Sequence, residues 1–265
     1  MQIVGYRTGT GGLTYDPVEG IDGEPGPATL VFADDGAVRR EPLDPGGDIS
    51  YTLGRRHCAG TLEGDEHVAC DAPAAPYCAE HTSTWLCAQC AGDCELPLEA
   101  CREEHAVYLA AFAPDRFKVG VTRLWRLPAR LREQGADRAA HVRTVSNGRI
   151  ARRIEAGIAE DLPDRVPTDR KIAGLGADLD EAAWNDLLEG FEVIETYAFD
   201  YGVDLADRPV AETLATGEVR GTKGRLLVLE NGAGTYAVDL RDLLGHEVEP
   251  GATDRDLQAS LGAFG

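Results

Sequence analysis

Residues 107–113 (VYLAAFA) and 117–122 (FKVGVT) are the two stretches that bear most directly on the fold of this chain. Both are short and rich in Val, Tyr, Phe and Thr, which suit the pleated surface of a sheet, and the intervening PDR is typical of a turn. The pattern predicts a hairpin of adjacent strands. Such a hairpin would place Tyr108 beside Gly120.

The segments after this hairpin alternate between helical and extended patterns. Residues 127–136 (LPARLREQGA) have Pro near the start and Gly near the end, which predicts a helix, and 140–146 predicts a third strand. Residues 150–158 carry isoleucine at every fourth position, which predicts an amphipathic helix, and 178–190 predict another. Glu155 lies at the edge of the isoleucine stripe, where its carboxylate can face a cleft or face solvent.

The flanking regions predict further parts around this segment. Short strand-like runs separated by Gly and Pro predict small β units at both ends of the chain. The sequence therefore predicts an α+β protein with an α/β core, preceded by a cysteine-rich region and flanked by β units. We expect a small β unit at 1–56, a zinc-binding region at 57–105, an α/β domain at 106–192 and a C-terminal β unit at 193–265.

The overall composition is that of an acidic globular protein. Hydrophobic residues make up 43% of the 265 residues, and the formal net charge is -20. No apolar run is long enough for a membrane span and the start lacks a signal-peptide pattern, so we expect a cytoplasmic protein that is not bound to membranes. The 26 basic residues include only three lysines. An acidic, lysine-poor surface is typical of halophilic proteins, although a GC-rich mesophile is an alternative source.

Positive charge is concentrated in residues 116–153. This window holds eleven Lys and Arg residues against two acids, a local net charge of +9 in a chain of -20. Such a cluster favours an anionic partner, and DNA or RNA phosphates are the leading candidates. The alternative is that these side chains pair with acids elsewhere on the surface. The candidate nucleic-acid contacts are Arg123, Arg126, Arg132, Arg152 and Arg153.

All seven cysteines lie within residues 58–101, which predicts metal binding rather than disulfides in a reducing compartment. With one histidine they supply the eight ligands of two structural zinc sites. A redox C-x2-C motif is a competing interpretation. The predicted sets are Cys58, Cys70, Cys78 and His81, and Cys87, Cys90, Cys94 and Cys101. His57, His67 and His105 are further candidates, and His105 could replace Cys101.

In its order of strand, strand, arginine helix, strand, glutamate helix and helix, the chain resembles the GIY-YIG nuclease core (β-β-α-β-α-α). Residues 107–109 (VYL) resemble the first tripeptide and 118–120 (KVG) the second, with Lys118 in place of its tyrosine. Arg130 resembles the helix arginine and Glu155 the metal-binding glutamate. Over 57–240 the chain resembles a domain-of-unknown-function family of zinc-ribbon proteins with a GIY-YIG-like domain, as an acidic member of haloarchaeal type.

The resemblance implies a zinc-containing nucleic-acid-processing protein that acts as a metal-dependent endonuclease. Glu155 would hold Mg²⁺ or Mn²⁺, Tyr108 would position the attacking water, and Arg130 would clamp the phosphate. Lys118 would act as an electrostatic partner in place of the missing tyrosine. Two alternatives remain open: a non-catalytic zinc protein that binds DNA or RNA, and a protein-interaction scaffold built on zinc knuckles.

Overall fold

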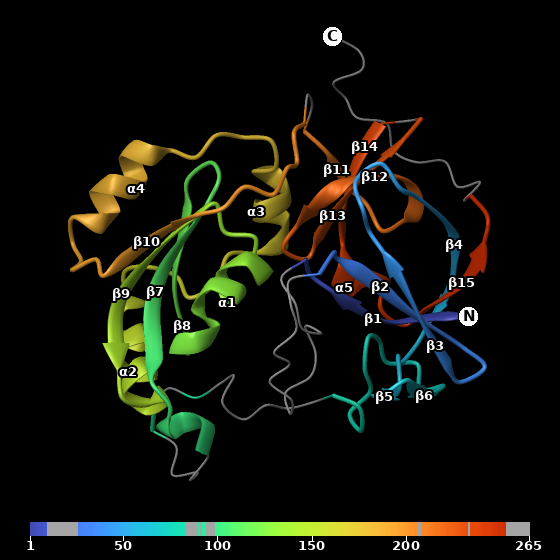
Figure 1. Ribbon diagram of the computed structural model, residues 1–265, viewed down its shortest axis with the longest axis horizontal. Coiled ribbons are helices and arrows are strands. Elements are labelled where there is room, and N and C mark those ends of the chain that lie inside the picture. The colour runs from blue at the N-terminus through green and yellow to red at the C-terminus, as the bar shows by residue number, and fades with distance from the viewer. Residues whose placement is uncertain are drawn as a thin grey trace. The chain divides into compact units, whose positions relative to one another are not determined.

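The chain forms two compact units in the computed structural model, which describes residues 1–9, 26–82, 90, 92–93, 99–205, 208–232 and 234–252. One unit combines Met1–Ser83 with Tyr201–Gly265, and the other is Thr84–Asp200. Figure 1 shows strands in both units and helices mainly in the second. The mixed α+β class expected from the sequence is confirmed, with most of the regular structure in sheets.

The first unit is a large sheet built from both ends of the chain. Its strand order is β11-β14-β13-β12-β4-β15-β1-β2-β3-β6-β5. The β11–β14 pair is parallel, and β12 pairs with β4 and β15 with β1 in antiparallel fashion. The elements are β1 (Gln2–Arg7), β2 (Thr29–Asp34), β3 (Ala37–Pro42), β4 (Asp48–Arg56), β5 (Thr61–Glu63), β6 (Glu66–Val68), β11 (Val210–Ala211), β12 (Ala215–Lys223), β13 (Leu226–Asn231), β14 (Gly234–Asp239), α5 (Leu240–Leu243) and β15 (His246–Pro250).

One apolar core holds this sheet together. Phe32 on β2, Ile49 on β4 and Leu229 on β13 belong to the same buried cluster, although β2 and β13 lie far apart in the strand order. The sheet must therefore curve around its own side chains. The strand-like runs that the sequence shows near the two termini thus share a single core.

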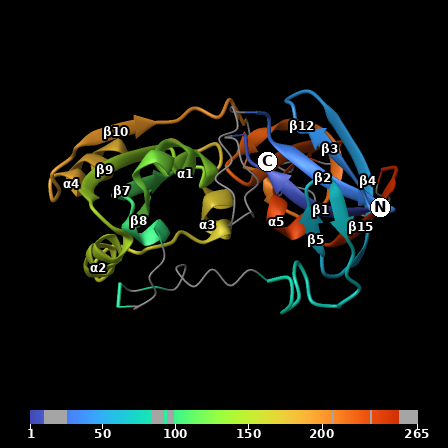
Figure 2. The same ribbon diagram turned by 60° about the horizontal axis from the view of Figure 1, so that its bottom comes forward.

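The second unit contains the hairpin predicted from 107–113 and 117–122. Its antiparallel sheet has the order β10-β9-β7-β8, which Figure 2 also shows. Tyr108 pairs with Gly120 in register, as expected. The elements are η2 (Glu99–Arg102), β7 (His105–Phe112), β8 (Arg116–Arg123), η3 (Leu124–Arg126), α1 (Leu127–Glu133), β9 (Arg138–Val145), α2 (Gly148–Ile158), α3 (Thr168–Ala173), α4 (Glu181–Leu188) and β10 (Glu195–Ala198).

Side chains of β7 alternate between two apolar layers, because successive residues of a strand point to opposite faces. Tyr108 and its even-numbered neighbours pack with Leu127 and Leu131 of α1. Val107 and its odd-numbered neighbours pack with Ala151 of α2 and Trp184 of α4. The face of the sheet on which a residue lies therefore decides which helices it can meet.

Local signals explain where two helices of the second unit, α2 and α4, begin. The Asn147 side chain accepts a hydrogen bond from the Ile150 amide at 3.0 Å, and the Asp180 side chain accepts one from the Ala183 amide at 3.0 Å. Both are ordinary N-caps. The Asp180 cap explains why α4 begins at Glu181 and not at the predicted residue 178. None of the helices in the described parts of the chain has the length and apolar character needed to cross a bilayer.

The second unit does not reproduce the predicted β-β-α-β-α-α core, because it contains two further elements, a strand and a short helix. A fourth strand, β10, pairs with β9 from Glu195–His141 to Ala198–Arg138. The short helix α3 is also additional to the helices that the sequence predicts. Its six residues are too few for the apolar periodicity on which such predictions rest.

Candidate metal centre and functional site

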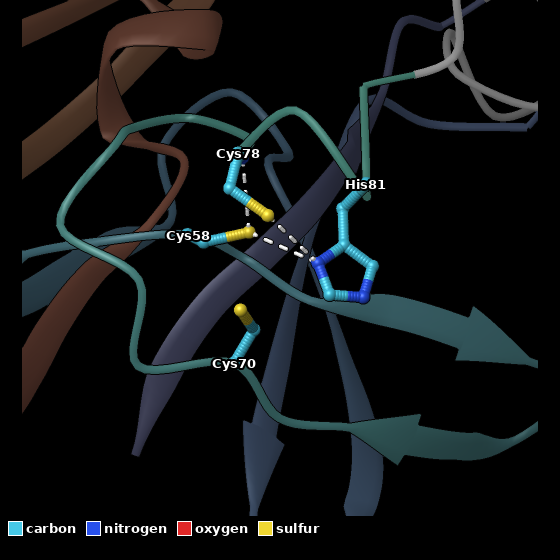
Figure 3. A group of neighbouring side chains, drawn as sticks. All are labelled: Cys58, Cys70, Cys78 and His81. Carbon is cyan, nitrogen blue, oxygen red and sulfur yellow. Dashed lines mark hydrogen bonds between the residues drawn. The ribbon is translucent and has the colours of Figure 1, made fainter.

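Cys58, Cys70, Cys78 and His81 gather at one point of the first unit, as the sequence predicts (Figure 3). Their three sulfur atoms and one imidazole nitrogen all lie within 4.8 Å of one another. Three thiols and an imidazole form a donor set typical of structural zinc. The group could therefore hold one metal ion with four protein ligands.

Strands β4, β5 and β6 bring the first two of these cysteines together. Cys58 follows β4, and Cys70 follows β6 after the β5–β6 hairpin has reversed the chain. The Cys58 amide donates to the Ala72 carbonyl at 2.9 Å, which ties the two segments together. Gly60, at a φ of +67°, has no room for a side chain, because a Cβ there would lie 2.1 Å from the Val68 carbonyl oxygen. This close approach of two backbone segments explains why residue 60 is a glycine.

The other two ligands lie on one tight loop. The His81 and Thr82 amides donate to the Cys78 carbonyl at 3.1 and 2.7 Å, which folds the C-x2-H segment back on itself. His81 Nδ1 then lies 3.2 Å from Cys78 Sγ and 3.4 Å from Cys58 Sγ. In a zinc tetrahedron this nitrogen–sulfur edge is about 3.6 Å. The loop is thus close to the geometry of a bound site.

The surroundings favour a thiolate at Cys78 and disfavour one at Cys70. Burial raises the pKa of the Cys78 thiol, but hydrogen bonds from the His81 backbone and ring and from the Glu80 backbone lower it to a net value of about 7. The Ala72 backbone lowers the pKa of the Cys70 thiol, but burial and the neighbouring Cys58 and Cys78 outweigh it and raise the pKa. A cation bound among these sulfurs would stabilise the thiolate form of each, including Cys70.

His57 and His67 lie beside the cluster and support it rather than joining it. The His57 Nδ1 lies 2.8 Å from the Cys70 carbonyl oxygen, and the His67 Nε2 lies 2.8 Å from the Ala59 carbonyl oxygen. His57 is buried and its Nε2 lies 3.3 Å from a Glu247 carboxylate oxygen on β15. Such contacts hold a ligand loop in place.

Replacing His57 by alanine is expected to weaken metal binding without removing a ligand. Loss of its bond to the Cys70 carbonyl frees that loop, and such changes typically weaken affinity about 10- to 100-fold. Competition with a chromophoric chelator measures the change. His246→Ala is the matched control, because the His246 ring bonds the Gly54 carbonyl instead. Equal affinities for the two variants would contradict the role of His57.

The second predicted zinc set falls partly on residues that the structure does not describe. Cys87 and Cys94 lie outside the described residues, whereas Cys90 and Cys101 lie within them. The Gly92 amide donates to Cys90 Sγ at 3.3 Å. His105, the predicted substitute for Cys101, lies at the start of β7, with its Nδ1 2.8 Å from the Glu103 carbonyl oxygen. The second site therefore stays a prediction.

Tyr108, Lys118 and Arg130 come together on the α1 face of the second unit. The side-chain amide of Gln134 donates to the Tyr108 hydroxyl at 2.6 Å, and Lys118 Nζ donates to the Gln134 Oε1 at 3.2 Å. Burial lowers the pKa of the Arg130 guanidinium, but the Tyr108 hydroxyl and the Glu133 carboxylate outweigh this effect. The pKa is therefore raised above its usual value. We call these five residues the Tyr108 cluster.

Glu133 gives the Tyr108 cluster its charge balance. Its buried carboxylate accepts hydrogen bonds from Arg126 Nη2 at 2.9 Å and from Arg130 Nη1 at 3.3 Å. Two guanidiniums share this one carboxylate. Both guanidinium side chains remain nearly half exposed, at 43% and 47%. The segment from η3 into α1 therefore presents positive charge to solvent beside the buried tyrosine.

Glu155 belongs to the opposite layer. It lies on α2, on the same helical stripe as Ala151, which packs with Val107 and the other odd-numbered residues of β7. Its carboxylate is buried and forms an ion pair with Arg152 Nη1 at 2.7 Å. The four residues grouped by the GIY-YIG resemblance are thus divided: Tyr108, Lys118 and Arg130 meet, and Glu155 lies across the sheet.

Many of the basic side chains in 116–153 have acidic partners. Besides Arg126 and Arg130, which share Glu133, Arg123 lies 3.7 Å from Glu103. Arg132 lies over the Phe199 ring, and Arg153 donates to the Gly92 carbonyl. Surface pairing, the alternative that the sequence left open, therefore accounts for some of the basic side chains in this window. The window's ion pairs join Arg116, Arg123, Arg126, Arg130, Arg138 and Arg152 to Asp115, Glu103, Glu133, Glu181 and Glu155.

Sequence reasoning missed Gln134, Glu133 and Trp125. Gln134 follows Arg130 by four residues, a spacing that places both on one side of a helix, and this is the only local signal for it. Glu133 is one of the two acids of the basic window, and its position in the sequence indicates no further role. Trp125 has no pattern of its own, and its exposure is visible only in the structure.

Comparison with protein-family models gives a match. A family model described as "Protein of unknown function (DUF2797)" matches residues 69–248, which include Cys70, Cys78, His81 and the whole Tyr108 cluster. No curated protein and no solved structure matches the chain. Residues 69–248 are 180 of the 265 residues, well over half of the chain. The chain therefore belongs to the DUF2797 family.

Proposed function

We propose that this protein is a zinc-containing nucleic-acid-binding protein that holds the phosphate backbone of DNA or RNA along α1. The observation that carries the proposal is the pair of half-exposed guanidiniums, Arg126 and Arg130, held in place by the single buried carboxylate of Glu133. Guanidiniums fixed in this way are pre-organised for phosphate oxygens. The chain as a whole has a net charge of -20 and therefore repels anions such as nucleic acids. A local positive face offsets this repulsion where the phosphates bind.

The zinc sites have a structural part in this proposal. A closed Cys3His site leaves no open coordination position for a substrate, so it stabilises the fold of its unit. We propose a second such site at Cys87, Cys90, Cys94 and Cys101, supported by the Gly92 amide bond to Cys90 Sγ, because amide donors stabilise a thiolate. The acidic composition supports a cytoplasmic protein of a halophile, of haloarchaeal type.

A second candidate function is phosphodiester cleavage by a divergent GIY-YIG-type site. It is favoured by the meeting of Tyr108, Lys118 and Arg130 on one sheet face, which brings a hydroxyl, an ammonium and a guanidinium together. Cleavage would also need Mg²⁺ or Mn²⁺ held by Glu155. Glu155 is engaged by Arg152 in the other layer, so binding without cleavage is the better-supported function.

Binding should depend on salt and on Arg126 and Arg130. We expect the zinc-loaded full-length protein to bind oligonucleotides with an affinity that falls as salt rises. The double change Arg126→Gln and Arg130→Gln should lower the slope of log K against log salt by about 2, close to 0.9 per phosphate contact on duplex DNA. Fluorescence anisotropy across a salt series measures both quantities.

A matched control removes the same charge elsewhere in the unit. Arg165→Gln with Arg170→Gln changes two exposed arginines outside the basic window and should leave the slope unchanged. Absence of binding at every salt concentration would refute the proposed function and favour a protein-interaction scaffold. Cleavage that requires Mg²⁺ or Mn²⁺ and disappears in Glu155→Ala would establish the nuclease instead.

A further inference from the structure

Trp125 is a large aromatic side chain that the second unit leaves on its surface. It lies on η3, the turn between β8 and α1, and 54% of it is exposed. By contrast, Trp184 of the same unit is buried in the core against Phe117. Exposing an indole ring costs hydrophobic free energy. Packing within the unit therefore does not explain a tryptophan at this exposed position.

Trp125 is also fixed in orientation. Its indole Nε1 donates to a Glu103 carboxylate oxygen at 2.9 Å, and the same carboxylate group lies 3.7 Å from Arg123. The guanidinium carbons of Arg123 and Arg126 each lie 5.9 Å from the centre of the Trp125 ring. A ring held by its polar edge and flanked by two cations is a pre-organised surface rather than a loose side chain.

This surface is continuous with the proposed phosphate contacts. Arg126, which lies over the Trp125 ring, shares the Glu133 carboxylate with Arg130 one turn further along. The chain of contacts therefore runs from the exposed indole through two guanidiniums to the Tyr108 cluster. A planar aromatic group seated on Trp125 would have positive charge next to it for the phosphate attached to that group.

We infer that Trp125 is a stacking platform for an unpaired nucleobase, so that the preferred ligand is single-stranded nucleic acid. The inference rests on the proposed function and names its substrate class. Base stacking on an aromatic ring needs an accessible base face, which single strands offer and duplex interiors do not. The flanking arginines add cation–π contact and hold the backbone. Their charge favours this ligand over an apolar protein partner.

The test compares strand types with the full-length, zinc-loaded protein. The probes are a twelve-nucleotide oligo(dT) carrying one 2-aminopurine and the matching duplex. We expect the single strand to bind more tightly, with quenching of the 2-aminopurine fluorescence by stacking. Trp125→Ala should weaken single-strand binding about ten- to a hundredfold and abolish the quenching. Trp125→Phe, which keeps an aromatic face, should retain most of both.

Two controls keep the test decisive. Ile194→Ala removes another exposed apolar side chain of the same unit and should leave binding unchanged. Thermal unfolding of Trp125→Ala shows whether the variant is folded, and Trp125→Phe carries the test if it is not. Two results would overturn this inference and leave the proposed function standing. One is salt-sensitive binding with equal affinity for single strand and duplex. The other is salt-sensitive binding whose affinity is unchanged in Trp125→Ala. No binding to either strand would overturn both.

Discussion

Cys58→Ser is expected to remove one equivalent of zinc per chain and to destabilise the unit that carries it. Cys58 is fully buried, its Sγ accepts the Cys78 amide at 3.3 Å, and the same sulfur lies 3.4 Å from His81 Nδ1. A metal that binds only the folded state stabilises it by about 4 kcal/mol when its concentration is a thousand times the dissociation constant. We therefore expect the free energy of unfolding to fall by that order.

Two measurements check this result. Elemental analysis gives the zinc content, and denaturant unfolding gives the stability with and without a chelator. The chelator should destabilise the unmodified protein strongly and the Cys58→Ser protein very little, because the variant has already lost that metal. The loss of one equivalent is expected whether the chain holds one zinc or two.

The matched control changes the same loop without touching a ligand. Glu80 is exposed and lies between Cys78 and His81, so Glu80→Gln should keep both the zinc content and the stability. A Cys58→Ser protein with unchanged zinc content would contradict the assignment of this site. So would a chelator that removes zinc with no effect on unfolding.

Gly120→Ala is expected to destabilise the second unit, against the usual direction of this substitution in a strand. A Cβ at position 120 would lie 2.5 Å from the Tyr108 hydroxyl oxygen and 2.6 Å from Cζ of the same ring. The ring is fully buried against Leu127 and Leu131 and bonded to Gln134, so it has no free space to enter. Overpacking of this kind costs about 1–3 kcal/mol.

A matched glycine in the same unit should respond in the opposite sense. Gly157 lies near the end of α2, and a methyl group added there would have nothing within 4 Å, so Gly157→Ala should stabilise by up to about 1 kcal/mol. Denaturant unfolding of both variants gives the two signs. Combining Gly120→Ala with Tyr108→Ala should cost less than the sum of the single changes, because the clash requires both side chains. Strict additivity would contradict the proposed close contact.

Short-range features of the fold could be read from the sequence because they depend on neighbouring residues. The pairing of Tyr108 with Gly120 follows from two β-forming runs joined by a short turn. The Cys78–His81 loop follows from C-x2-H spacing, which brings two ligands to one point without help from the rest of the chain. In both cases the interacting residues are close in sequence, so little else has to be known.

Sequence spacing could not predict whether His57 and His67 join the Cys3His group. His57 and His67 are as near to the cysteines in sequence as His81 is. Neither belongs to the Cys3His group, and one ring nitrogen of each lies against a backbone carbonyl oxygen beside it. Which partner a ring nitrogen finds depends on the path of β4, β5 and β6. That path is set by strand pairing and not by spacing.

The α+β class, the hairpin around Tyr108 and the Cys3His set at Cys58, Cys70, Cys78 and His81 all follow from the sequence alone. The folded structure was needed to show that strands from both ends of the chain share one sheet and that Glu155 lies across the second sheet from Tyr108. The physical reason is the same in both cases. Side-chain periodicity shows that a strand or helix has an apolar face, but it does not encode which distant element that face will meet.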